Sequence, residues 1–91
     1  MERDEILKAA IARYGEKAQM IIAMEEMAEL TKELSKFLRG AHNEDAIAEE
    51  IADVRIMLDQ LEIMFDCAGA AATYQAAKVE RLRKRLEETN G

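Results

Sequence analysis

The sequence predicts an all-α protein, an antiparallel bundle of about four helices that oligomerisation completes. Apolar residues recur at steps of three and four in four successive segments, which is the helical period. The composition agrees, because the chain has no proline, only 4% aromatic residues and a 35% charged share rich in helix-forming Glu, Lys and Arg. With 91 residues, the chain is expected to form a single domain over residues 1–91, whose small core would benefit from self-association.

The first two helices are separated by Gly15. A short amphipathic helix is predicted from about Arg3 to Tyr14, and a longer one from about Glu16 to Leu38. The apolar stripe of the longer helix comprises Met20, Met24, Met27, Leu30, Leu34, Phe37 and Leu38. A rotation of about 100° per residue places an amide and three acids along one flank of this stripe, namely Gln19, Glu26, Glu29 and Glu33.

A turn from Arg39 to Asn43 connects the second helix to the third. Gly40 is a natural helix terminator, and Asn43 is a suitable N-cap for a helix that runs from about Glu44 to Asp66. So short a connection predicts antiparallel packing of the two helices. The third helix carries a packing seam of Ile47, Ile51, Val54, Leu58, Leu61 and Phe65. Ile56 and Ile63 lie nearly opposite, so part of this helix is expected to meet another subunit.

A small-residue run around residues 66–73, which contains Gly69, predicts a break before the last helix. That helix should continue to about Glu88. Its inward face is predicted to carry Ala76, Val79, Leu82 and Leu86. Its outward face is basic, with Lys78, Arg81, Arg83, Lys84 and Arg85.

Charge and hydropathy exclude several classes of protein. A net charge of −6 argues against a dedicated nucleic-acid binder, which needs a basic surface. No apolar run approaches the roughly 20 residues that span a bilayer, and the charged opening residues do not resemble a signal peptide. The single cysteine, Cys67, excludes an internal disulfide. We therefore expect a soluble, cytoplasmic protein without a membrane or nucleic-acid partner. His42 stands alone, which argues against a ferritin-like di-iron centre.

Two acidic pairs, one on each long helix, form a candidate metal site. Glu26 with Glu29, and Glu50 with Asp53, are each three residues apart and so share a helix face. Both pairs lie roughly 10–18 Å from the same turn, so an antiparallel hairpin brings them level. Four facing carboxylates can coordinate Mg²⁺ or Mn²⁺. The alternative is that these acids belong to a solvated face, as is common on Glu-rich helices.

The ordered set of motifs resembles the all-α nucleoside triphosphate pyrophosphohydrolases of the MazG-like and dimeric dUTPase type. Their Glu-Glu-x-x-Glu and Glu-x-x-Asp signature matches residues 25–29 and 50–53. Tyr14-Gly15, Gln19 and the late Lys78 with Arg81 are similar to further family motifs, so the resemblance covers most of the chain. Tyr14 replaces a frequent Trp, and Gln75 a frequent Asn, which affects base selectivity more than metal chemistry.

The resemblance implies a role for each of these residues. Glu26, Glu29, Glu50 and Asp53 would be the metal ligands, and Mg²⁺, or Mn²⁺, would bridge the phosphates of a nucleoside triphosphate substrate. Glu25 or Glu49 would orient or deprotonate the attacking water. Lys78 and Arg81 would contact the outer phosphates, although from the sequence alone they fit a solvated basic helix end better. Gln19 would contact the base, although it equally suits a surface or hairpin-packing role. The products would be a nucleoside monophosphate and pyrophosphate, and the assembly a homodimer or homotetramer.

Two other functions fit the same residues. In a non-catalytic helical dimerisation or interaction module, these acidic residues would form only a solvated surface. Phosphoribosyl-ATP pyrophosphohydrolase, in the same superfamily, would use the same ligands with a different base pocket. Metal binding separates the first alternative from the enzymes, since a ligand that selects the native state must stabilise it.

Overall fold

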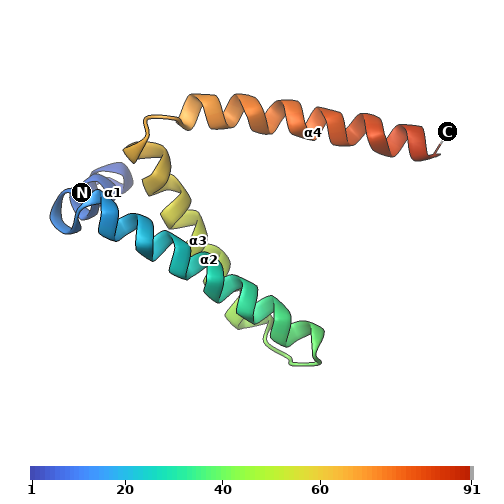
Figure 1. The fold of residues 1–91 in the computed structure, drawn as a ribbon, viewed down its shortest axis with the longest axis horizontal. Helices are drawn as coiled ribbons and strands as arrows, with labels where there is room; N and C mark the ends of the chain where they lie inside the picture. The colour runs from blue at the N-terminus through green and yellow to red at the C-terminus, as the bar shows by residue number, and fades with distance from the viewer. Residues whose placement is uncertain (91) are drawn as a thin grey trace.

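The computed structural model describes residues 1–90 and contains four helices over that range (Figure 1). They are α1 (Arg3–Tyr14), α2 (Glu16–Leu38), α3 (Glu44–Met64) and α4 (Ala68–Asn90). The described residues contain no strand, which confirms the predicted all-α class. In Figure 1, α2 and α3 form an antiparallel hairpin, α1 lies at its open end, and α4 extends away from it. Within one chain, therefore, the long helices pack as a pair rather than as a closed bundle.

The α2–α3 turn is built around a glycine, as the sequence predicts. Gly40 has a φ of 101°, a left-handed conformation that costs glycine nothing. This conformation lets the backbone N–H of Gly40 donate to Phe37 O (3.0 Å) and that of Ala41 donate to Lys36 O (3.1 Å). The two bonds satisfy carbonyls that the end of a helix leaves unpaired. The turn thereby reverses the chain and fixes α3 beside α2.

The break between α3 and α4 is shorter and earlier than the sequence predicts. It is centred on Asp66, whose φ is 49°, and Gly69 lies inside α4. Asp66 N donates to Ile63 O (3.2 Å) and Cys67 N donates to Glu62 O (3.0 Å), the same pattern that ends α2. Aspartate tolerates the left-handed conformation better than most residues. A helix end of this kind without glycine is not visible as a break in the sequence.

Asn43 precedes α3 but does not cap it through its side chain. Its Nδ2 instead donates across the hairpin to the backbone oxygen of Glu33 on α2, at 2.9 Å. Asn43 thus occupies the predicted N-cap position, but its side-chain amide bonds to the neighbouring helix and not to the first turn of α3. The side chain serves to tie the turn to α2.

The hairpin packs through a different line of residues from the one that the apolar stripes predict. The buried residues of α2 are Gln19 and Ala23, and those of α3 are Met57 and Gln60. Gln19 Nε2 donates to Gln60 Oε1 at 2.8 Å within this contact. Much of the predicted stripe of α2 is exposed, including Met24, Met27, Leu34, Phe37 and Leu38, and on the α3 seam Ile51, Leu58 and Phe65 are exposed. The rotation of each helix thus turns its polar flank toward its partner.

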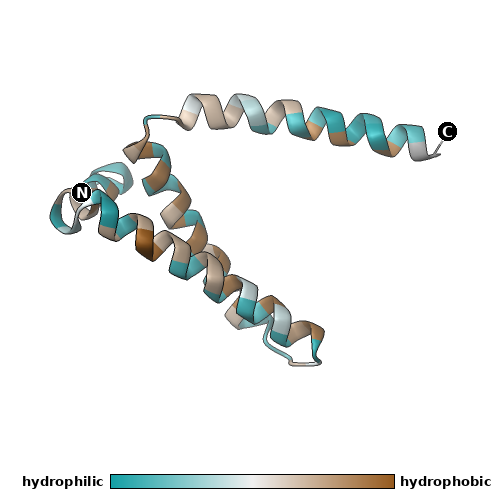
Figure 2. Cartoon of the chain, in the orientation of Figure 1, coloured by the Kyte–Doolittle hydropathy of each residue, from teal (hydrophilic) through white to brown (hydrophobic). Residues whose placement is uncertain are grey.

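The apolar face of α4 is also uncovered, which corrects its prediction as an inward face. Val79, Leu82 and Leu86 are 60%, 48% and 57% exposed, and α4 touches α3 only. Figure 2 shows hydrophobic residues recurring along α4, with no other helix beside them. The opposite side of α4 is ordered by ion pairs within the helix, where Arg83 lies between Glu80 and Glu87.

Candidate metal centre

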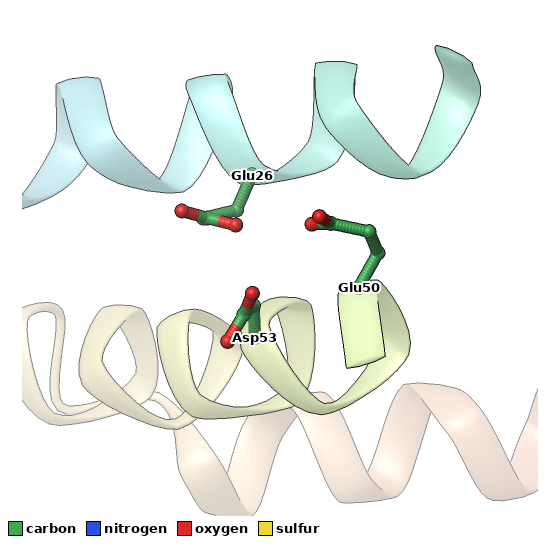
Figure 3. A group of neighbouring side chains, drawn as sticks. All are labelled: Glu26, Glu50 and Asp53. Atoms are coloured by element: carbon green, nitrogen blue, oxygen red, sulfur yellow. The ribbon is translucent and has the colours of Figure 1, made fainter. Parts of the chain in front are cut away.

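Three carboxylates meet across the middle of the α2–α3 hairpin. Glu26 extends from α2, and Glu50 and Asp53 extend from α3 (Figure 3). Each offers one carboxylate oxygen, and these three oxygens lie within 4.8 Å of one another. All three residues are half-buried. The predicted alignment of the two acidic clusters is therefore present for these residues, since the turn at Gly40 brings Glu26 level with Glu50 and Asp53.

The surroundings of Glu50 disfavour the charged form of its carboxyl group. Loss of hydration raises its carboxyl pKa above the ordinary value of 4.5, and the nearby charges of Glu26 and Asp53 raise the pKa further. Its Oε2 atom is buried without a hydrogen-bond partner. A buried carboxylate oxygen without a donor is costly, and a cation offsets both the lost hydration and the repulsion. The environment of Glu50 therefore favours either a proton or a metal ion.

This shift predicts how the stability of the metal-free protein depends on pH. Because the folded-state pKa of Glu50 is raised, the native state binds the proton more tightly than the unfolded chain does. The contribution of Glu50 to the unfolding free energy should thus increase as the pH falls through the raised value toward 4.5, and should be lost again as the pH rises. Urea unfolding in chelator-containing buffer at several pH values, for the wild type and Glu50→Gln, measures this contribution as a difference. Parallel pH profiles for the two proteins would contradict it.

Glu29, the fourth predicted ligand, lies at the edge of the group. Its side chain is exposed and is not one of the three that converge, yet its charge contributes to the raised pKa of Glu50. The two predicted catalytic acids, Glu25 and Glu49, are also exposed and directly precede Glu26 and Glu50 in the chain. The oxygen donors suit Mg²⁺ or Mn²⁺, which prefer carboxylates and retain several waters. The residues present therefore fit a hard divalent cation.

The three residues predicted to contact the substrate, Gln19, Lys78 and Arg81, are not members of this cluster. Gln19 is only 4% exposed and is paired with Gln60, so its amide belongs to the helix contact. Lys78 and Arg81 are exposed on α4, which has no contact with α2. Neither of them forms an ion pair with a carboxylate of the cluster in the described part of the chain. The cluster is thus formed without a basic partner from its own chain.

Gln60 and Asn43 are polar members of the hairpin contact that sequence reasoning missed. Gln60 follows Asp53 by seven residues, and Gln19 precedes Glu26 by seven, so both lie two turns from the cluster on the same side of their helices. Three buried oxygens without partners lie along the hairpin, namely Gln19 Oε1, Asn43 Oδ1 and Glu50 Oε2. The seven-residue repeat of polar side chains was the available signal. It indicates that polar side chains recur along a contact line that also buries Ala23 and Met57.

A surface cavity of about 360 Å³ lies elsewhere, at the joint between α1, α3 and α4. Its lining mixes both signs of charge, including the ion pair of Arg3 with Asp59, and includes none of the predicted site residues. None of the described helices is both long and apolar enough to span a membrane. Comparison with models of protein families, with curated proteins and with solved structures gave no match. The carboxylate cluster itself is therefore the basis for assigning a function.

Proposed function

We propose that this chain is a Mg²⁺-dependent nucleoside triphosphate pyrophosphohydrolase that works as a homodimer or homotetramer. It cleaves the bond between the α and β phosphates and releases a nucleoside monophosphate and pyrophosphate. The substrate class comes from the resemblance in sequence motifs. The observation that carries the proposal is the convergence of Glu26, Glu50 and Asp53, with a buried and unpartnered Oε2 on Glu50.

In this proposal Glu26, Glu50 and Asp53 would hold Mg²⁺, and Mn²⁺ would be a substitute. The bound cation would neutralise the triphosphate and stabilise charge that develops during the displacement. Glu29 lies close enough to act electrostatically on Glu50 and would be the fourth ligand. Glu25 or Glu49 accepts a proton from the water that attacks the α-phosphorus. The expelled group is pyrophosphate.

A substrate screen tests this assignment directly. Purified protein is incubated with each common ribo- and deoxyribonucleoside triphosphate and Mg²⁺, and the products are separated by anion exchange. We expect a nucleoside monophosphate and pyrophosphate in equal amounts, and no product when chelator replaces Mg²⁺. Release of a nucleoside diphosphate and phosphate would contradict the assigned cleavage position. Activity confined to phosphoribosyl-ATP would select that alternative.

Metal binding gives a prediction that does not need the substrate. Because the cation binds the folded cluster and not the unfolded chain, Mg²⁺ at about 100 times its dissociation constant should stabilise the protein by about 2.7 kcal/mol. For a domain of this size, that corresponds to a Tm increase of roughly 10–20 °C. Differential scanning calorimetry with Mg²⁺, Mn²⁺ and K⁺ measures the increase, and K⁺ serves as the ionic-strength control. An unchanged Tm and no heat of binding would favour the non-catalytic interaction module.

A further inference from the structure

One chain exposes far more surface than a compact protein of its size. The accessible area is 7158 Å², whereas a compact monomer of 10.3 kDa exposes about 5,400 Å². The radius of gyration is 16.6 Å, against about 12 Å for a compact domain of this length. The described residues with under 2% exposure include no large side chain. The chain therefore exposes roughly 1,800 Å² more surface than a compact monomer of the same mass.

Besides the exposed apolar residues of α2, the uncovered surface includes a periodic apolar stripe on each of two other helices. Ile51 and Leu58 on α3, and Phe65 directly after its end, are exposed at seven-residue spacing. On α4, Val79, Leu82 and Leu86 form an exposed stripe at steps of three and four. Stripes with these spacings are the geometry by which two helices pack along their lengths. Neither stripe has a partner in its own chain, because α4 leaves the hairpin at its first turn (Figure 1).

The charges of the two helices are complementary. Residues 44–66, which span α3 and its end, contain eight acidic residues and one basic residue, Arg55. Residues 68–90 of α4 contain five basic and three acidic residues. Lys78 and Arg81 have no ion-pair partner among the described residues. An α4 laid along an α3 would thus pair a basic helix with a strongly acidic one.

We propose that the α4 stripe of one copy packs against the exposed α3 stripe of a second copy, and that the exchange is reciprocal. In a two-fold symmetric dimer, each copy gives one α4 and receives one, so the exposed stripes of α3 and α4 are covered in both copies. If each copy buries its excess of roughly 1,800 Å², the total is about 3,600 Å², within the range of obligate homodimers. The occupant is therefore a second copy of this chain. This inference does not depend on the catalytic proposal.

The test compares three proteins by sedimentation at micromolar concentration. The wild type should sediment as a dimer or a larger even assembly. In Leu82→Glu with Leu86→Glu, two charges enter the proposed contact, so the dissociation constant should rise by at least about a hundredfold. The control is Ala77→Glu, which adds a charge half a turn away on the same exposed helix and should leave the assembly unchanged. A wild-type monomer, or an assembly equally resistant to both changes, would overturn the proposal.

Hydrogen exchange on the wild type keeps the test decisive if the double variant fails to fold. When α4 packs on a second copy, the amides of residues 76–86 should be protected, and dilution below the dissociation constant should remove that protection. Unprotected amides in this range within an intact assembly would refute the exchange. Protection that persists in a monomer would show that α4 folds onto its own hairpin instead.

Discussion

Replacing Glu50 by glutamine is expected to lower kcat/KM for triphosphate cleavage by at least about a thousandfold, while the fold persists. Glu50 lies close to the charges of Glu26 and Asp53, and its amide counterpart is a poor ligand for a divalent cation. Removing one of three facing charges relieves repulsion, so the metal-free variant should melt at the same temperature as the wild type or higher. Steady-state kinetics and calorimetry on the same preparation measure both effects.

Glu44→Gln provides a matched control for this change. Glu44 is exposed at the start of α3, outside the cluster, and its substitution changes the net charge by the same amount. It should retain wild-type kinetics and the full Mg²⁺-dependent increase in Tm. The Glu50 variant should lose that increase. If Glu50→Gln unfolds instead, or remains active, the carboxylate has a structural role and the metal assignment is wrong.

Lys78→Ala is expected to lower kcat/KM by about ten- to a thousandfold, with little change in Mg²⁺ affinity in the absence of nucleotide. Its positive charge is proposed to stabilise the negative charge that accumulates on the departing pyrophosphate. Because α4 has no contact with α2 in its own chain, this effect requires that Lys78 acts across a subunit interface. Near wild-type kinetics would indicate that Lys78 and Arg81 belong to a solvated face and have no catalytic role.

Mixing the Glu50→Gln and Lys78→Ala variants, both of lowered activity, distinguishes action within one chain from action between chains. In a dimer that joins a Glu50→Gln copy to a Lys78→Ala copy, one site combines an intact cluster with an intact Lys78 if the two residues come from different chains. Random mixing should then restore about a quarter of wild-type activity, since half of the dimers are mixed and each has one intact site of two. If both residues act within one chain, mixing restores nothing. Mixing Glu50→Gln with wild type provides the control for subunit exchange.

More of the candidate site than of the helix packing can be predicted from the sequence. The spacing of Glu26, Glu50 and Asp53 on two helices joined by a short turn is a local property, and counting residues from Gly40 aligns them. Glu29 shows the limit of this reasoning. It shares a helix face with Glu26, yet its side chain remains exposed, because the rotation of α2 places Glu26 closer to the contact line.

The sequence by itself determined the four helices, their approximate ends and the antiparallel hairpin, because helical period and the turn at Gly40 act over a few residues. Only the tertiary structure decided which face of each helix meets its neighbour. The predicted apolar stripes are largely exposed, and the helices instead meet along a mixed line that contains the Gln19–Gln60 hydrogen bond. The left-handed Asp66 ends α3, after which α4 extends away from the hairpin. Several faces of each helix have similar hydrophobicity, so the face that packs against a neighbour depends on contacts with residues far apart in the chain.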